Sequence, residues 1–147
     1  MRARLPVGAG MWPAFWLVPK DGKAGEIDIM EAFGAAYQGV GGCTQIHWAL
    51  HGTPAEPVQG SWVTTSADIC LGYHTYAVDW EPDTITWYFD GNKIAQTPTP
   101  PWANRPMYII ANLAVGGSWA GPPAGESSSM AIDYIRVYAA KPVASNN

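Results

Sequence analysis

The sequence predicts an all-β protein, an antiparallel β-sandwich of jelly-roll type. Short apolar runs alternate with turns rich in the chain's 16 glycines and 13 prolines, and no segment shows the periodicity of a helix longer than one or two turns. Many short strands joined by such turns are typical of sandwiches and jelly rolls. The 147 residues are expected to form a single domain at residues 1–140, followed by a tail at residues 141–147.

Each predicted strand is a run of mainly apolar or alternating residues bounded by glycine, proline or polar turns. In chain order, strands are expected at residues 11–18, 25–31, 43–52, 68–71 and 73–80, 84–89, 93–96, 107–115 and 130–138. Asp90-Gly91 is a strong signal for a hairpin turn. The near-continuous apolar run at residues 107–115 predicts a strand that is covered on both faces. The stretches 32–42 and 53–66 are expected to be loops at the rim of a cleft.

Three carboxylates are spaced along the second predicted strand. Side chains alternate between the two faces of a strand, so Glu26 and Asp28 share one face and strict alternation turns Glu31 to the other. A β-bulge near Ile29 and Met30 would return Glu31 to the face of the other acids. Retaining glycoside hydrolysis uses two carboxyl groups about 5–5.5 Å apart. The alternative is that these acids merely face solvent.

Further blocks accompany the three acids and cover nearly the whole chain. They are Gly10-Met11-Trp12-Pro13-Ala14-Phe15-Trp16-Leu17, His74-Thr75-Tyr76-Ala77-Val78-Asp79-Trp80, Trp87-Tyr88-Phe89-Asp90-Gly91, Asn112-Leu113-Ala114-Val115-Gly116-Gly117 with Trp119, and Ile132-Asp133-Tyr134-Ile135-Arg136-Val137-Tyr138. Together with the acidic strand, they resemble glycoside hydrolase family 16 in its laminarinase-like branch. The resemblance implies a concanavalin A-like jelly roll, and we expect the chain to begin partway through the family domain.

The resemblance also implies an activity, that of an endo-acting retaining β-glucanase working by double displacement. Glu26 is then the nucleophile, Glu31 the general acid/base and Asp28 the modulator between them. On this assignment the pKa of Glu31 is expected to be raised while Glu26 stays ionised, because crowded like charges do not all ionise. The rate profile is expected to be bell-shaped, near neutral pH or on its acid side.

The spacing of the acids bears on the substrate. The pattern E-x-D-x-x-E found here resembles that of laminarinases, whereas the shorter E-x-D-x-E resembles that of lichenases. We therefore expect the β-1,3 linkages of laminarin-type glucans first, mixed-linkage β-1,3-1,4-glucan second, and galactans such as agarose or carrageenan last. The alternative in another class is an inactive carbohydrate-binding β-sandwich, because the missing N-terminal strands of the family would supply cleft residues.

Other side chains are expected to bind substrate, namely Trp12, Trp16, His47, Asn112 and Trp119. The resemblance places Trp12 and Trp16 near the reactive centre, where flat rings stack on sugars, with burial of both in the core as the alternative. His47 lies beside the acids if its strand pairs with the acidic strand. It is favoured over His51, which adjoins a turn, although a strand histidine is often only a surface group.

The resemblance implies a polysaccharide substrate as the partner, and composition argues against other partners. The formal net charge of −4 argues against nucleic acid or an anionic membrane as a partner. No apolar run approaches the ~20 residues that cross a bilayer. Residues 1–4 lack the apolar stretch of a signal peptide, although the resemblance implies an extracellular (secreted) protein. The oligomeric state is left open.

Two expectations concern metals and thiols. The chemistry requires no cofactor. Family members often hold one Ca²⁺ through a carboxylate at the position that Asp133 matches. Calcium binds about six to eight oxygen ligands, and the N-terminal segment that would supply several of them is expected to be missing. We therefore expect no metal to be retained. Cys43 and Cys70 allow either one disulfide or two buried thiols.

Overall fold

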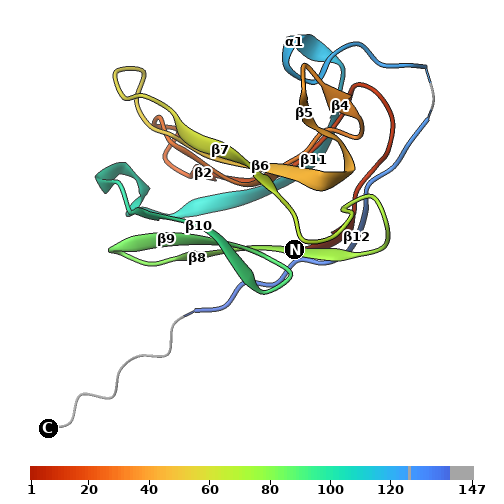
Figure 1. The fold of residues 1–147 in the computed structure, drawn as a ribbon. Coiled ribbons are helices and arrows are strands. Elements are labelled where there is room, and N and C mark those ends of the chain that lie inside the picture. The colour runs from red at the N-terminus through yellow and green to blue at the C-terminus, as the bar shows by residue number, and fades with distance from the viewer. Residues whose placement is uncertain (126, 140–147) are drawn as a thin grey trace, which may run out of the picture.

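The chain folds into two antiparallel sheets of five strands each that pack face to face (Figure 1). The computed structural model describes residues 1–125 and 127–139, so the predicted tail at residues 141–147 lies outside the described residues. In chain order the strands are β1 (Arg2–Arg4), β2 (Met11–Pro19), β3 (Glu26–Glu31), β4 (Ala36–Tyr37), β5 (Val40–Gly41), β6 (Gln45–His51), β7 (Gln59–Thr64), β8 (His74–Trp80), β9 (Thr84–Phe89), β10 (Asn92–Pro98), β11 (Met107–Val115) and β12 (Ala131–Tyr134).

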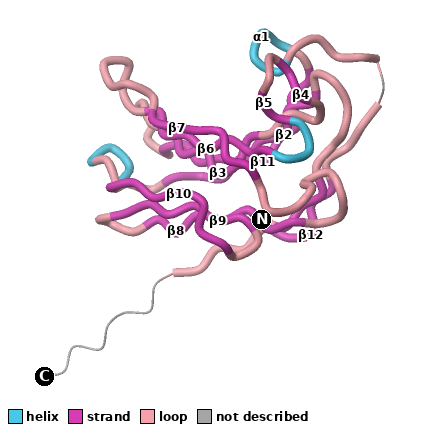
Figure 2. The backbone as a smooth tube through the Cα atoms, viewed as in Figure 1, coloured by secondary structure: helices cyan, strands magenta, loops and turns pink. Residues whose placement is uncertain are grey.

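The strand order is β10-β9-β8-β1-β12 in one sheet and β11-β2-β3-β6-β7 in the other, and β4 and β5 form a separate small hairpin. Helical structure in the described residues is limited to single turns (Figure 2). These are η1 (Gly42–Thr44), η2 (Pro101–Ala103) and α1 (Gly117–Ala120). The predicted all-β class is confirmed. No helix of the described residues is long and apolar enough to cross a membrane.

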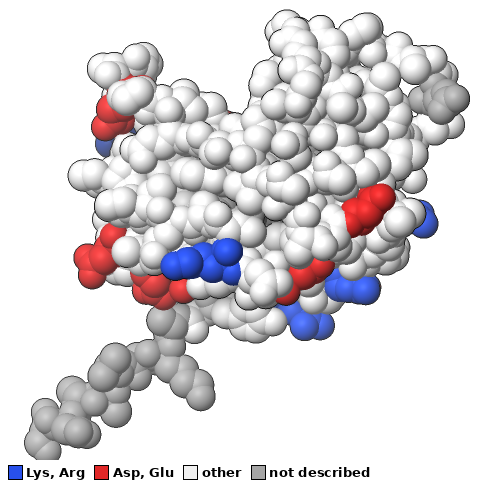
Figure 3. Space-filling view, in the orientation of Figure 1, with Lys and Arg blue, Asp and Glu red and all other residues white. Residues whose placement is uncertain are grey.

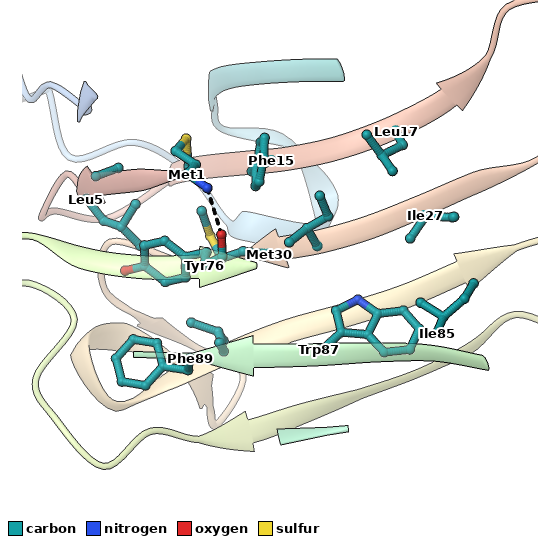
Figure 4. Packing of buried hydrophobic residues seen from close by; sticks show 14 of the residues in the cluster. Met1, Leu5, Phe15, Leu17, Ile27, Met30, Tyr76, Ile85, Trp87 and Phe89 are labelled. Atoms are coloured by element: carbon teal, nitrogen blue, oxygen red, sulfur yellow. Dashed lines mark hydrogen bonds between the residues drawn. The ribbon is translucent and has the colours of Figure 1, made fainter. Parts of the chain in front are cut away.

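The core lies between the two sheets, where each sheet contributes its apolar face (Figure 4). Phe15, Leu17 and Ile27 of one sheet are buried against residues such as Tyr76 and Trp87 of the other. Burying side chains of this size stabilises the fold by about 1.5–3 kcal/mol each. The Trp87 indole N–H also donates a 2.9 Å hydrogen bond to the backbone oxygen of Asp28, which ties the two sheets together behind the acidic strand.

Strand β3 carries the β-bulge that the acid spacing predicts. Opposite β2, Asp28 pairs with Trp16 and Met30 pairs with Phe15, so Ile29 is one extra residue. Opposite β6, two residues separate Asp28 from Glu31 where only one separates their partners. Ile29 and Met30 are both buried. The extra residue therefore resets the alternation and returns Glu31 to the face of Asp28.

The strand predicted at residues 68–71 was wrong, because these residues form a turn in which the Asp68 carboxylate accepts a hydrogen bond from the Cys70 N–H. Three further predictions were wrong for a reason that lies outside the segment itself. Residues 53–66 are not all loop, because β7 pairs with β6 along residues 59–64. Strand β11 is not covered on both faces, because it lies at a sheet edge with Tyr108 50% exposed. The last strand does not extend to Tyr138, because β12 ends at Tyr134. In each case the deciding factor is which distant segment lies alongside, and short-range pattern does not contain that information.

Cys43 and Cys70 form a disulfide, with their Cα atoms 5.2 Å apart. The bond joins η1, just before β6 in one sheet, to the segment that leads into β8 in the other. A backbone hydrogen bond from Ile69 to the Cys43 oxygen accompanies it. His74 holds the same segment by contacts with Asp90 and with backbone oxygens, so its role is structural.

Candidate active site

Glu26, Asp28 and Glu31 share the outer face of the sheet, opposite the core. The sequence places them there because Ile27 and the two bulge residues take the inward positions. The flanking strands β2 and β6 pair with β3 on both sides, so the acids stand near the middle of the sheet. Figure 3 shows a hollow above this sheet, beside the lobe that carries α1, while the charged side chains visible in that view lie mainly along the opposite side.

Two ring nitrogens contact the Glu31 carboxylate. The Trp12 indole N–H donates to Oε1 at 3.0 Å, and His47 Nδ1 lies 3.2 Å from Oε2. Glu31 is 9% exposed, and an indole N–H can only donate, so Oε1 serves as an acceptor. A histidine ring nitrogen can donate or accept, depending on its tautomer, so this contact is compatible with a group that must both give and take a proton.

The other two acids surround a second histidine. His51 Nε2 lies 2.9 Å from Asp28 Oδ2 and 3.7 Å from Glu26 Oε1. Asp28 is only 2% exposed, and its Oδ2, which makes no well-aligned hydrogen bond among the described residues, has the His51 ring as its close cationic neighbour. The Asp28 carboxylate raises the pKa of His51. An imidazolium beside a buried carboxylate offsets the cost of burying that charge.

Glu26 holds a proton more tightly than an ordinary glutamate. Burial and then the neighbouring Asp28 carboxylate raise the pKa of Glu26 to about 7, against the opposing effect of His51. The expectation that Glu26 stays ionised around neutral pH was therefore wrong. The physical reasons are that burial disfavours the charged form of Glu26 and that Asp28, two residues away on the same face, would place a like charge beside it.

Aromatic side chains form a wall beside the acids. Trp119 on α1 packs edge-on against Trp12 at 4.9 Å between ring centroids and against Phe33 at 4.7 Å. It also lies 5.4 Å from the His47 ring and 5.7 Å from the Trp62 ring. The structure thus brings together residues from β2, β6, β7 and α1 that are far apart in the chain. A wall of this kind offers flat apolar surface with N–H donors at its edge.

Trp16 and Asn112 lie on the same face of the sheet. The Trp16 indole N–H donates a 2.7 Å hydrogen bond to Asn112 Oδ1, and β11 pairs with β2 over its full length. All five residues predicted to bind substrate therefore stand on the face of the acids or at its rim. Their contacts with a substrate stay a prediction.

Sequence reasoning undervalued one residue and missed another. His51 was ranked below His47 because it adjoins a turn, yet each histidine contacts acids of the site. Trp62 lies in a stretch predicted to be a loop, but β7 pairs it directly with His47. The one available signal for Trp62 was a bulky aromatic within a polar stretch, which alone does not indicate a strand.

The described residues contain two groups of side chains with metal-ligating atoms close together. One is Glu26, Asp28 and His51, in which the His51 ring already lies against both carboxylates, and the other includes the two cysteines of the disulfide. Asp133, the predicted calcium candidate, belongs to neither and pairs instead with Arg2 at 2.6 Å. A lone carboxylate that already has a cationic partner does not fit a calcium site.

The arrangement supplies two carboxyl groups with different roles and a third between them. The Glu31 carboxylate contacts the ring nitrogens of Trp12 and His47. Burial and the Asp28 carboxylate raise the pKa of Glu26 to about 7. Such a set can combine nucleophilic attack with general acid and base catalysis on a polar substrate held against aromatic rings.

Comparison with known proteins agrees with this chemistry. The model of the family described as "Glycosyl hydrolases family 16" matches residues 1–136. The chain is 40% identical over 141 residues to endo-1,3-1,4-beta-glycanase ExsH of Rhizobium meliloti, a match that covers 94% of the chain and 29% of that protein. It is 35% identical over 161 residues to glucan endo-1,3-beta-glucosidase A1 of Niallia circulans, covering 93% and 23%.

Among solved structures, the X-ray structure of endo-beta-1,3-glucanase from Pyrococcus furiosus matches with a TM-score of 0.72 and 31% identity. The match covers 88% of the chain and 55% of that chain. The chain thus spans less than a third of the length of these two curated relatives and about half of the solved one.

Proposed function

Because the chain belongs to glycosyl hydrolases family 16, we propose that it is an endo-acting retaining β-glucanase that hydrolyses β-1,3 linkages of laminarin-type glucans. The observation that carries this proposal is the bulge at Ile29, which brings Glu26, Asp28 and Glu31 to one face beside an aromatic wall. Without the bulge, Glu31 would point into the core, and Glu26 and Asp28 would be the only acids of β3 left on this face.

In the first step, the Glu26 carboxylate attacks the anomeric carbon and the bond to the leaving oxygen breaks as Glu31 gives that oxygen its proton. In the second step, Glu31 takes a proton from water, the water oxygen attacks the same carbon, and the ester to Glu26 breaks. Two inversions give overall retention. Positive charge develops on the sugar ring in both steps, and the buried Asp28 carboxylate lies where it can stabilise that charge.

The contacts of Glu31 support its role in this scheme. Its Oε1 accepts a hydrogen bond from Trp12, which leaves Oε2, beside His47, as the oxygen that exchanges the proton. The raised pKa of Glu26 means that the free site holds a proton that must leave Glu26 before attack. Activity should therefore fall as the pH drops through about 7, because the protonated form cannot attack.

The relatives' names support both β-glucan substrates. These include a glucan endo-1,3-beta-glucosidase and endo-1,3-1,4-beta-glycanases. The order, with β-1,3-glucan first and mixed-linkage β-1,3-1,4-glucan second, rests on the E-x-D-x-x-E spacing of Glu26, Asp28 and Glu31. The protein is proposed to act outside the cell, which fits a polymeric substrate and the Cys43–Cys70 disulfide.

The test is release of reducing sugar from laminarin, lichenan and agarose by the wild-type chain and by Glu26→Gln and Glu31→Gln. Laminarin should give the highest rate with a ladder of oligosaccharides, and both variants should lose at least about 10³-fold, as expected for removal of a nucleophile or an acid/base group. Glu56→Gln, which changes an exposed loop carboxylate, is the matched control. Binding of laminarin by the wild-type chain without any sugar release would favour the non-catalytic alternative.

Azide distinguishes the two roles. With Glu26→Ala and an activated β-glucoside, azide should replace the carboxylate in a single displacement and give an α-glycosyl azide. With Glu31→Ala, azide should attack the ester on Glu26 and give a β-glycosyl azide. The opposite pair of products would exchange the roles of the two glutamates.

A further inference from the structure

A row of side chains crosses three strands on the face of the acids. Glu31 of β3 pairs with His47 of β6, and His47 pairs in turn with Trp62 of β7. Residues directly opposite each other on neighbouring strands bring their side chains together on one face of the sheet. The row therefore links the proposed acid/base, through one histidine, to Trp62.

The histidine ring in this row has little polar contact to orient it. His47 Nδ1 lies 3.2 Å from Glu31 Oε2, and the ring makes no other hydrogen bond within the described part of the chain. Rotation about the Cβ–Cγ bond of a histidine is broad and roughly two-fold. A half-turn about that bond would put the Cδ2 carbon where Nδ1 now lies, and Glu31 would lose its partner. Packing must therefore decide which edge of the ring faces Glu31.

Two indoles supply that packing. The His47 ring centroid lies 5.2 Å from that of Trp62 and 5.4 Å from that of Trp119. The two indole centroids are 5.7 Å apart, so the three rings form a compact triangle. The buried Phe33 ring packs edge-on against both indoles, at 4.8 and 4.7 Å, and supports the triangle from another side. The His47 side chain is only 17% exposed as a result, which leaves its ring little room to turn.

The two indoles differ in how firmly the backbone holds them. Trp62 stands within β7, which pairs with β6 along residues 59–64. Trp119 stands on α1, a single turn between Gly116 and Gly121, whose φ angles of 79° and 81° lie in the region that favours glycine. A strand ladder fixes a side chain more firmly than a single helical turn between two glycines does. Trp62 is therefore the member of the triangle best placed to hold the His47 ring.

We propose that Trp62 is a positioning residue for the acid/base: it fixes the His47 ring with Nδ1 toward Glu31 Oε2, and so keeps the Glu31 carboxyl group aimed at the leaving oxygen. The inference rests on the proposed function, in which Glu31 gives its proton to that oxygen. Trp62 acts through His47 and does not need to touch the sugar. Its loss should therefore slow the step that requires the proton and leave the KM for laminarin nearly unchanged.

The first test compares a substrate that needs the proton with one that does not. Trp62→Leu should lower kcat/KM for laminarin at least about tenfold, a part of what general acid catalysis contributes. The value for 2,4-dinitrophenyl β-laminaribioside, whose leaving group departs without a proton, should change less than about twofold. Trp62→Phe keeps a flat ring beside His47 and should restore most of the laminarin rate. Tyr73→Leu removes a half-exposed ring just before β8 of the other sheet, and this matched control should change neither rate.

A double-mutant cycle tests whether Trp62 acts through His47. In the His47→Ala protein there is no ring to position, so Trp62→Leu should lower kcat/KM for laminarin less than about twofold further. An equal loss in both backgrounds would show that Trp62 acts independently of His47, and it would overturn the proposal. Equal losses on laminarin and on the dinitrophenyl substrate, or no loss on laminarin, would also overturn it.

The orientation of the ring can also be measured without substrate, by nitrogen NMR of the histidine rings. Glu31→Gln should displace the Nδ1 signal of His47, because that atom contacts the Glu31 carboxylate. In the Trp62→Leu background the same change should displace the signal less than about half as far, because the ring no longer keeps Nδ1 toward residue 31. Equal displacements in both backgrounds would overturn the proposal. A wild-type chain that releases no sugar from laminarin would instead refute the proposed function, and these spectra alone would then decide whether Trp62 orients the ring.

Discussion

The contact between His51 and Glu26 is expected to set the acid side of the rate profile. His51 Nε2 lies 3.7 Å from Glu26 Oε1 and opposes the rise in the Glu26 pKa. The pKa of His51 is itself raised by Asp28, so the ring carries a charge to higher pH than an ordinary histidine. Replacing it by glutamine removes a positive charge that stabilises ionised Glu26. The pKa of Glu26 must then rise further, and the acid limb of the rate profile, where activity falls with decreasing pH, must move to higher pH.

The size of this effect follows from the geometry. The two side chains are 40% and 33% exposed, and the dielectric constant of water gives the lower limit of their interaction. Coulomb's law at 3.7 Å then gives about 1.1 kcal/mol. Because 1.36 kcal/mol corresponds to one pH unit, the acid limb for laminarin hydrolysis should move up by about 0.8 pH unit. Salt should reduce the displacement, since exposed charges are screened.

The assay is kcat/KM for laminarin between pH 4 and pH 9 for the wild type, His51→Gln and His51→Lys. The lysine variant keeps a positive charge and should bring the limb back toward the wild-type position. Thermal unfolding of each variant shows whether the fold is retained. An acid limb of His51→Gln that stays in place or moves to lower pH, in a folded protein, would refute the electrostatic role given to His51.

The remaining predictions concern single contacts. Trp12→Phe keeps an aromatic ring, smaller than the indole, but removes the N–H that donates to Glu31. A hydrogen bond to a charged group is worth about 1.5–3 kcal/mol, so kcat should drop about 10- to 100-fold with little change in KM. An unchanged kcat would contradict the assignment. Added calcium at millimolar concentration should leave the Tm unchanged, because Asp133 already pairs with Arg2. Only an ion that the native state binds would raise the Tm. A rise in Tm that Asp133→Ala abolishes would show a calcium site. The Cys43–Cys70 disulfide spans 27 residues, and its reduction should lower the free energy of unfolding by about 3.5 kcal/mol from the loop entropy of the unfolded chain. The measurement is urea unfolding with and without reductant. Equal unfolding midpoints would show that the bond contributes nothing.

The amino-acid pattern alone was sufficient for the fold class, the core strands and the common face of the acids. Alternation in residues 11–18 separates Trp12 and Trp16 from the buried Phe15 and Leu17, and the structure agrees. The bulge could also be predicted, because three carboxylates can share one face only if the spacing between Asp28 and Glu31 is broken by one residue. These features depend on backbone geometry within a few residues, which a sequence shows directly.

Tertiary structure decided what depends on neighbours from elsewhere in the chain. Trp62 lies beside His47 only because β7 pairs with β6, and polar residues around it conceal that strand. The proton affinity of Glu26 depends on its burial and on its distances to Asp28 and His51. The spacing of these residues in the sequence gives neither the burial nor the distances. The last strand stops at Tyr134 although its sequence continues to alternate. A strand needs a partner for its backbone groups, and whether one lies alongside is settled by the assembled sheet rather than by the strand's own residues.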